Sequence, residues 1–344
     1  MKKIFLAAVA MTAIFASCSK ETEPVTNHSE TTADSPQVLI TFTTEESASR
    51  SFFDNTATAE SWEKEINSMS LYVFNSAGNP VLRRDFTPAE LASKSATFSL
   101  PNEAAGMTCD FYVVANTDYG TIVNKSAMIE KAELTPLSDY NGTTAVVMNQ
   151  TARTDGFVMN GHRSTTIADK GSVTNVALSI KRVVAKVAVR ATIAPELAQK
   201  YGGTVFIESA TIWKVSSASY SYFNPLKYPD RGMVYSHEQV SGTNGAYKEN
   251  LFYIYENDEL AVGERLTLTL KGKYDADSNA TTTYDQMDVS YDIELTGIGN
   301  GKILRNGYYR IEANIQGLSG DGVVVTFTVA EWELPVTQSV NLGS

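Results

Sequence analysis

Residues 70–82 read Ser70-Leu71-Tyr72-Val73-Phe74-Asn75-Ser76-Ala77-Gly78-Asn79-Pro80-Val81-Leu82. The run from 70 to 74 is short and apolar, and its Tyr, Val and Phe side chains favour a β-strand. Residues 75–80 combine Asn, Ser, Gly and Pro, which supply the backbone conformations that turns require. The stretch therefore predicts a strand, a turn and a second strand.

Strand-length apolar runs, separated by Gly, Asn and Asp turns, recur to the end of the chain. They lie at 97–100, 110–115, 173–180, 183–190, 205–215, 251–255, 266–270, 289–295, 308–315 and 323–329. Helices are expected to be few and short, at 87–90, 124–134 and 195–201. This pattern predicts an all-β protein built from antiparallel β-sandwiches. The 344 residues fit two such domains, which we place at 37–181 and 182–344.

The beginning of the chain has the features of an export signal. Met1-Lys2-Lys3 is cationic, residues 4–16 are apolar but too few to span a bilayer, and small residues lead to Cys18. This order is typical of a bacterial lipoprotein signal peptide at 1–18, in which the Cys18 thiol receives a diacylglycerol and the new amine a further chain such as palmitate. An ordinary secretory signal is the alternative. Both predict a location outside the cytoplasm.

Composition excludes several other roles. Residues 19–36 are almost wholly polar and cannot bury enough apolar surface to fold, so we expect a disordered tether. The net charge of −11 argues against a nucleic-acid partner. With Cys18 lipidated, Cys109 has no disulfide partner, and its strand-like surroundings predict a small buried core residue.

The sequence lacks the motifs of catalysis and of cofactor binding. It has only three histidines and no Gly-x-Ser-x-Gly, His-Glu-x-x-His or P-loop motif. Residues 275–279 imitate the start of a calcium loop, but Ala280 and Gln286 stand where that loop needs Gly and Glu. A hairpin tip is the better interpretation. We expect no catalytic residue, no metal site and no cofactor.

Three segments together give a hypothesis about function. The first is the strand pattern Val38, Ile40 and Phe42, directly after the tether. The second is the polar segment that ends at Arg50, after which an Arg-specific, trypsin-like protease could cut before Ser51. Lys20 and Lys64 compete with Arg50 as such sites, and a lone Arg is also compatible with a solvated side chain.

The third segment is the C-terminal tail, 333–344, in which apolar and polar residues alternate. Its apolar face consists of Leu334, Val336, Val340 and Leu342, and Gln338 interrupts that face. A free amphipathic end of this length is typical of a donor strand, which adds to the sheet of another molecule. The alternative is an ordinary edge strand of its own sheet.

Strand replacement connects the three segments. If cleavage releases the leader strand, 37–50, its sheet exposes unpaired backbone groups that accept another strand. Four buried apolar side chains, at roughly 1.5–3 kcal/mol each, would stabilise the exchanged strand by about 6–12 kcal/mol. A head-to-tail contact of this kind does not close on itself, so it produces a filament.

Six segments are notable for their sequence and for their order along the chain: 66–74 with Gly78, 111–116, 157–161, 180–187, 308–311 and 329–332. In these segments the sequence resembles the major fimbrial subunit (fimbrillin, FimA-type) family of Bacteroidales, the type V pilins. The resemblance implies two transthyretin-like β-sandwich domains and export as an outer membrane lipoprotein. It further implies cleavage after an Arg or Lys by an outer-membrane-associated protease, and assembly with other pilin subunits by strand exchange. It assigns the lipid to Cys18, the cut to Arg50 and the donor strand to the tail.

The leading hypothesis is a structural shaft subunit of a cell-surface fimbrium, matured by proteolysis. One alternative is an anchor or tip subunit of the same fimbriae, which keeps its first strand and its lipid. Another is a surface lipoprotein that binds glycans or host molecules through exposed aromatic side chains. The candidates for that role are Tyr220, Tyr222, Phe223, Tyr228 and Tyr235. An enzyme is the least favoured class.

Overall fold

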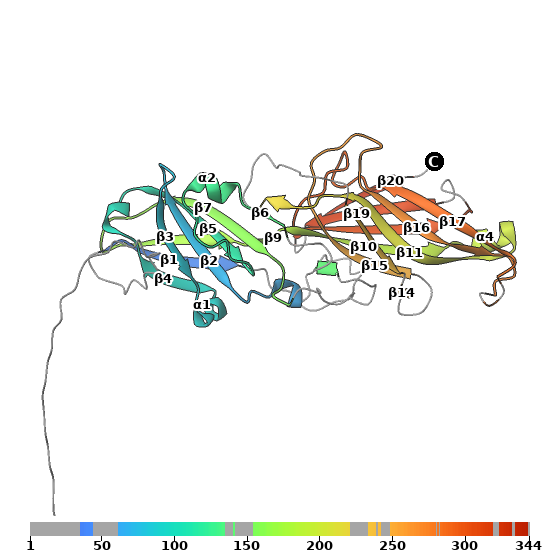
Figure 1. Cartoon of the computed structure of the whole chain (residues 1–344), viewed down its shortest axis with the longest axis horizontal. Coiled ribbons are helices and arrows are strands. Elements are labelled where there is room, and N and C mark those ends of the chain that lie inside the picture. Colours follow the sequence, from blue (N-terminus) through green and yellow to red (C-terminus); the bar gives the residue numbers. More distant parts are fainter. Residues whose placement is uncertain are drawn as a thin grey trace, which may run out of the picture.

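The described part of the chain is mainly β-sheet, as predicted (Figure 1). The computed structural model describes residues 35–43, 61–134, 140–141, 154–220, 233–238, 240–241, 248–279, 281, 283–318, 323–331 and 334–342. It describes only the backbone at 61, 233–238, 240–241, 248–249, 323–331 and 334–342.

The described strands between Gln37 and Arg182 form two facing sheets. A three-stranded sheet has the order β4-β1-β8, and a five-stranded sheet has the order β3-β2-β5-β7-β9. The strands are β1 (Gln37–Thr43), β2 (Met69–Asn75), β3 (Pro80–Asp85), β4 (Ser95–Ser99), β5 (Thr108–Ala115), β7 (Met159–Thr166), β8 (Val173–Ser179) and β9 (Lys181–Arg182). Apolar side chains of both sheets, such as Ile40 and Phe111, are buried in one core.

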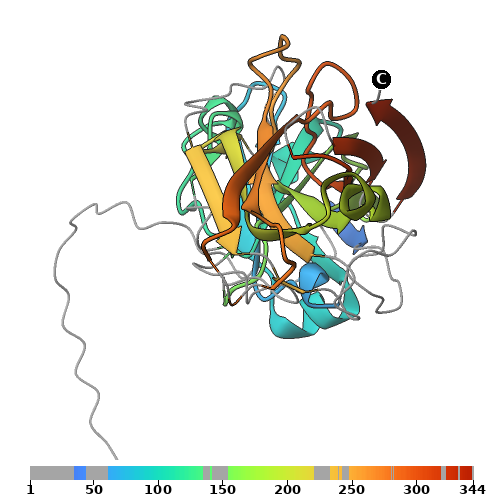
Figure 2. The same ribbon diagram turned by 90° about the vertical axis from the view of Figure 1, so that its right-hand side faces the viewer.

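Residues 184–342 form a second pair of sheets, which lies beside the first along the long axis of the molecule (Figure 1). One has the order β14-β15-β10-β18-β19-β20 and the other β13-β11-β16-β17. The strands are β10 (Val184–Ile193), β11 (Thr204–Val215), β13 (Met233–Glu238), β14 (Val240–Ser241), β15 (Lys248–Tyr255), β16 (Thr267–Asp275), β17 (Gln286–Glu294), β18 (Gly307–Ile315), β19 (Val323–Glu331) and β20 (Leu334–Leu342). In Figure 2, β20 lies at the margin of the molecule.

The described helices are short and end at recognisable signals. They are η1 (Ser61–Lys64), α1 (Pro88–Ser93), η2 (Asn102–Ala104), α2 (Lys125–Ile129) and α4 (Pro195–Tyr201). The predicted capping box is present in α1, where Thr87 and Glu90 cap each other's backbone N–H groups. The predicted end of α4 is also confirmed, because Gly202 adopts φ 88° there.

The helix predicted at 124–134 is too long. Asn124 caps α2 as a helix start, but α2 ends at Ile129. Residues Ala132–Glu133 instead form β6, which pairs antiparallel with β12 (Ser219–Tyr220). This pairing ties the N-terminal part of the chain to the C-terminal part, so tertiary contact overrides the local helix preference.

Among the described strands, two pairs are parallel rather than antiparallel. β1 runs parallel to β8, and β10 runs parallel to β18. The sequence analysis also missed β7, because its residues from His162 to Thr166 carry no apolar alternation. Backbone pairing with β5 holds that polar strand in place, in a register that sets Tyr112 against His162.

Other expectations about the interior are met. Cys109 is buried without a disulfide and faces the core, as predicted. The predicted hairpin tip at 275–279 is confirmed, because β16 and β17 pair antiparallel up to Asp275 and Gln286. Within the described parts of the chain, no helix has the length and apolar character needed to cross a membrane.

Candidate functional site

The first strand, β1, occupies the middle of its sheet. It pairs antiparallel with β4, from Gln37 opposite Ser99 to Thr41 opposite Ser95. On its other side it pairs parallel with β8 over all seven residues, from Gln37 to Thr43. Hydrogen bonds extend the pairing at both ends: the Phe42 N–H donates to the Lys94 carbonyl at 3.1 Å, and the Leu100 N–H donates to the Pro36 carbonyl at 2.9 Å. Both edges of β1 are therefore used.

The side chains of β1 alternate between the core and the outside. Val38 and Ile40 are fully buried and Phe42 is 3% exposed, whereas Thr41 and Thr43 are exposed. Phe42 packs edge-on against Phe86, with 5.8 Å between the ring centroids. At roughly 1.5–3 kcal/mol for each buried side chain, the three apolar residues hold β1 in place by about 5–9 kcal/mol.

The other predicted site residues are less completely described. Cys18, Arg50 and Ser51 lie outside the described residues. Leu334, Val336, Val340 and Leu342 lie in β20, whose side chains are not described. β20 is an edge strand, with β19 as its one neighbour in the sheet. The structure thus places the leader-strand residues and the donor-strand residues in different sheets of one chain and does not bring them together.

A buried charge network at the junction of the two pairs of sheets was missed by the sequence analysis. The Lys186 ammonium lies 2.7 Å from Glu63 Oε1, with both side chains at most 5% exposed. The Tyr253 hydroxyl donates to the same oxygen at 2.8 Å. Burial and then the Glu63 carboxylate raise the pKa of Tyr253 well above its ordinary value, so it stays protonated as a donor.

Further groups fix the same junction. Arg182 donates from Nε to the Glu63 carbonyl at 2.7 Å and from Nη1 to Asn306 Oδ1 at 3.0 Å. Trp62 lies against the rings of Phe157 and Tyr253, with centroid distances of 5.9 and 6.1 Å. η1, the first described element after the predicted cut, is therefore anchored to strands of the C-terminal part. The signal in the sequence was Lys186, the one charged residue among the apolar side chains of residues 183–189.

The tip of the β16–β17 hairpin brings three carboxylates together. Oxygen atoms of Asp275, Asp277 and Asp285 all lie within 4.8 Å of one another. Their described partners are protein groups: Gln286 donates to Asp275 at 3.0 Å, and the Asn279 N–H donates to Asp277 at 2.8 Å. Burial alone would raise the pKa of Asp275, but its hydrogen bonds with Gln286, Asp277 and the backbone N–H groups of Asn279 and Ser278 hold that pKa below its usual value. The cluster stabilises the turn.

Of the aromatic residues considered for ligand binding, the structure describes only one with its side chain. Tyr220 is half-buried in β12, and the carbonyl of this residue accepts a hydrogen bond from Arg305. Tyr222, Phe223 and Tyr228 lie outside the described residues, and the side chain of Tyr235 is not described. The described part of this stretch gives no aromatic platform.

Comparison with known proteins finds one family model that matches part of the chain. Residues 37–193 match the model of the family described as major fimbrial subunit protein (FimA). No curated protein matched the chain. The resemblance drawn from the sequence is confirmed by the family match.

Solved structures share the fold over most of the chain. A fimbrilin from Porphyromonas gingivalis has a TM-score of 0.59 at 15% identity, covering 89% of this chain and all of its own. A putative cell adhesion protein from Bacteroides eggerthii has a TM-score of 0.59 at 16% identity, with 87% of this chain and 96% of its own covered. The tip fimbrial protein Mfa3 from Porphyromonas gingivalis, truncated at its C-terminus, reaches 0.53 at 15% identity, with coverage of 86% and 99%.

These findings agree with a chain whose sequence has no catalytic motif and whose sheets carry the folding pattern of fimbrillins. Over residues 37–193 the chain thus matches the family of major fimbrial subunit proteins (FimA), and this match together with the shared fold supports a structural subunit of cell-surface fimbriae rather than an enzyme.

Proposed function

We propose that the chain is a shaft subunit that polymerises by exchanging its first strand. In this proposal the precursor is exported as an outer membrane lipoprotein through Cys18, and an Arg-specific, trypsin-like protease cuts it between Arg50 and Ser51. The released leader strand, β1, is then replaced by the tail, 333–344, of another subunit. The domains at 37–181 and 182–344 act as acceptor and donor respectively.

The observation that carries the proposal is the position of β1 between two strands. Loss of β1 would free the edge of β4 over five paired positions and the edge of β8 over seven. It would also uncover the apolar residues that now pack on Val38, Ile40 and Phe42. Unpaired strand edges beside apolar surface bind an added strand strongly.

The tail has the pattern that such a groove requires, with one constraint on register. β1 buries three alternate positions, so a replacement must present three as well. On the tail, every set of three consecutive positions among 334, 336, 338, 340 and 342 includes Gln338. We place Gln338 at an end of the groove, because an unpaired amide at the centre would lose several kcal/mol relative to water.

The decisive experiment is electron microscopy of purified protein before and after limited trypsin treatment, with N-terminal sequencing of the product. Wild-type protein should form filaments after treatment and should begin at Ser51. Arg50→Ala should remain a lipid-bound monomer, and a chain that ends at Glu333 should fold but not extend a filament. Filaments formed by either variant would refute strand exchange at these positions.

Single substitutions in the tail test the register. Leu334→Asp should weaken assembly strongly, because it would bury an unpaired charge. Gln338→Leu should make filaments more resistant to heat in detergent than wild type, because it removes the polar interruption. Filaments that retain Cys18 and residues 37–50 in the mature product would instead identify an anchor or tip subunit.

A further inference from the structure

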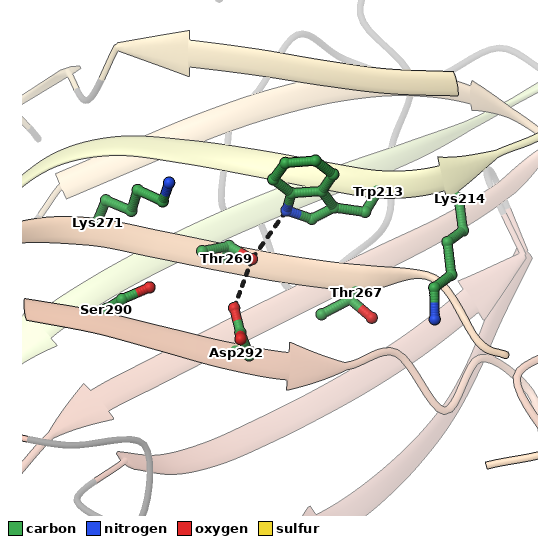
Figure 3. A pocket seen from close by; sticks show the side chains of 7 residues that line it. All are labelled: Trp213, Lys214, Thr267, Thr269, Lys271, Ser290 and Asp292. Carbon is green, nitrogen blue, oxygen red and sulfur yellow. Dashed lines mark hydrogen bonds between the residues drawn. The ribbon is translucent and has the colours of Figure 1, made fainter. Parts of the chain in front are cut away.

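An open hollow of about 510 Å³ lies on the outer face of the four-stranded sheet, far in sequence from β1. Its lining comes from three neighbouring strands, β11, β16 and β17 (Figure 3). The residues that line it are Trp213, Lys214, Thr267, Thr269, Lys271, Ser290 and Asp292. Its volume falls within the range of roughly 300–1,000 Å³ that is usual for small-molecule sites.

A β-bulge places two adjacent residues in this hollow. Ile212 and Val215 both face the core and are fully buried, although an odd number of steps separates them. The register of β11 against β13 shifts between these two residues, and Lys214 adopts a left-handed φ of 63°. The extra residue allows Trp213 and Lys214 to face outward together. Bulges of this kind re-aim side chains and are frequent beside functional sites.

A chain of two hydrogen bonds fixes the indole ring of Trp213. Its Nε1–H donates to the Thr269 hydroxyl at 2.9 Å, and that hydroxyl donates to Asp292 Oδ1 at 2.6 Å (Figure 3). Thr269 is 5% exposed, whereas Trp213 keeps 38% of its surface exposed. The ring nitrogen is thus satisfied by the protein, and a large apolar ring surface is held in one orientation toward solvent.

Polar groups beside the ring are available to a ligand. In the described part of the chain, the Lys271 ammonium, the Ser290 hydroxyl and Asp292 Oδ2 have no hydrogen-bond or ion-pair partner. The Lys214 ammonium, by contrast, donates to the Gly263 carbonyl. The hollow therefore offers one cationic donor, one hydroxyl and one carboxylate acceptor around a fixed aromatic face.

We propose that this hollow binds a neutral pyranose unit of a glycan, with the sugar ring stacked on Trp213. One face of a pyranose presents C–H groups, which pack against the negative face of an aromatic ring. Its hydroxyl groups both donate and accept, so Asp292 and Ser290 can accept from them and Lys271 can donate to them. The net charge of −11 opposes sialylated and sulfated glycans. The proposal is independent of the way in which subunits assemble.

The test is a printed glycan array that carries neutral oligosaccharides and, as a separate arm, sialylated and sulfated ones. The strongest neutral probe is then titrated into the protein by calorimetry. Wild type should bind neutral glycans, and Trp213→Ala should weaken binding by about tenfold or more. Tyr284→Ala is the matched control, because Tyr284 is an aromatic residue with 86% exposure outside the hollow, and it should bind as wild type.

Polar variants keep the test valid if Trp213→Ala does not fold. Lys271→Gln and Asp292→Asn should each weaken binding severalfold, whereas Lys273→Gln, two positions along β16 from Lys271, should not. No binding by wild type, binding of acidic glycans alone, or unchanged binding by Trp213→Ala would each overturn the proposal.

Thr269 is assigned as a positioning residue for the ring. Thr269→Val removes the hydrogen bond that holds the indole while keeping the shape of the side chain, so it should weaken binding of the same probe. Thr269→Ser restores the hydroxyl and should rescue binding. A loss that Thr269→Ser does not rescue would show that the hydrogen-bonded chain does not orient the ring.

Discussion

The strands β1 and β10 occupy equivalent positions but are held in different ways. Each is the first strand of its pair of sheets in the described chain. Each pairs antiparallel on one side, β1 with β4 and β10 with β15. Each also pairs parallel on the other side, β1 with β8 and β10 with β18. Backbone topology alone therefore does not distinguish them.

Their side chains do distinguish them. β1 buries one face only, and none of its side chains takes part in a described hydrogen bond or ion pair. β10 buries both faces along its first six residues and carries Lys186, which is paired with Glu63. Another strand with the same apolar alternation could therefore replace both the backbone pairing and the buried apolar side chains of β1. Removal of β10 would instead leave a buried carboxylate without its cation.

The largest expected effect comes from placing a charge in each strand. Val187→Asp buries an unpaired carboxylate in β10 and should cost more than about 5 kcal/mol, so that the sheets formed by 184–342 fail to fold. Ile40→Asp should only expel β1. Hydrogen exchange measured by mass spectrometry should then be fast in β1, β4 and β8 and slow elsewhere. Global exchange in Ile40→Asp would mean that β1 is not a separable strand.

The next effect concerns the buried ion pair. Glu63→Gln leaves the Lys186 ammonium buried without a counter-charge and should lower the free energy of unfolding by about 3–5 kcal/mol. Asp258→Asn breaks the half-exposed pair with Lys302 and should cost less than about 1 kcal/mol. Urea unfolding of the two variants checks this. Equal small losses would show that the junction does not depend on this pair.

Comparison of these strands shows which parts of the fold could be predicted from the sequence and which could not. Alternation at Val38, Ile40 and Phe42 predicted β1 and its buried face, because period two is a local property. The parallel pairing of β1 with β8 joins residues more than 130 positions apart, and no local pattern encodes such a partner. β7 was missed because backbone hydrogen bonds to β5, rather than apolar side chains, hold its second half.

Local sequence patterns also could not reveal the partners within the buried ion pair or the lining of the hollow around Trp213. Lys186 stood out in an apolar run, but its partner Glu63 lies 123 residues away and could be assigned only from the fold. The hollow around Trp213 depends on a bulge, which one positive φ at Lys214 creates. Its residues come from three strands whose registers the sequence does not state. By contrast, the cap of α1 was predicted fully, because Thr87 and Glu90 are three residues apart.

A smaller effect on the free energy of unfolding should come from alanine substitutions on the two faces of β1 and of β10. Ile40→Ala should lower the free energy of unfolding by about 2–4 kcal/mol, and Leu39→Ala, on the other face of β1, by less than about 1 kcal/mol. In β10, Val184→Ala and Val187→Ala lie on opposite faces, yet both are fully buried and should each cost about 2 kcal/mol. Denaturant unfolding should thus show face dependence in β1 and none in β10.

The smallest effect is a pH dependence in the five-stranded sheet that packs on the sheet of β1. Asp110 accepts a hydrogen bond from Lys125 at 2.6 Å and lies 3.3 Å from His162 Nε2. Burial alone would raise the pKa of Asp110, but hydrogen bonds from Lys125, Ser164 and His162 and the lysine charge hold it below its usual value. The folded state therefore binds this proton less tightly than the unfolded chain, where the pKa is about 3.9.

Stability from Asp110 is consequently present above the unfolded pKa and is lost as the pH falls through the lower folded pKa. Asp110→Asn should be less stable than wild type by about 1 kcal/mol at pH 7, and the two should converge in acid. Asp288→Asn, whose carboxylate is 93% exposed in its pair with Lys273, is the control and should change the free energy of unfolding at pH 7 by less than about 0.5 kcal/mol. If the Asp110→Asn curve stays parallel to wild type down to low pH, the carboxylate acts through packing and not through its charge.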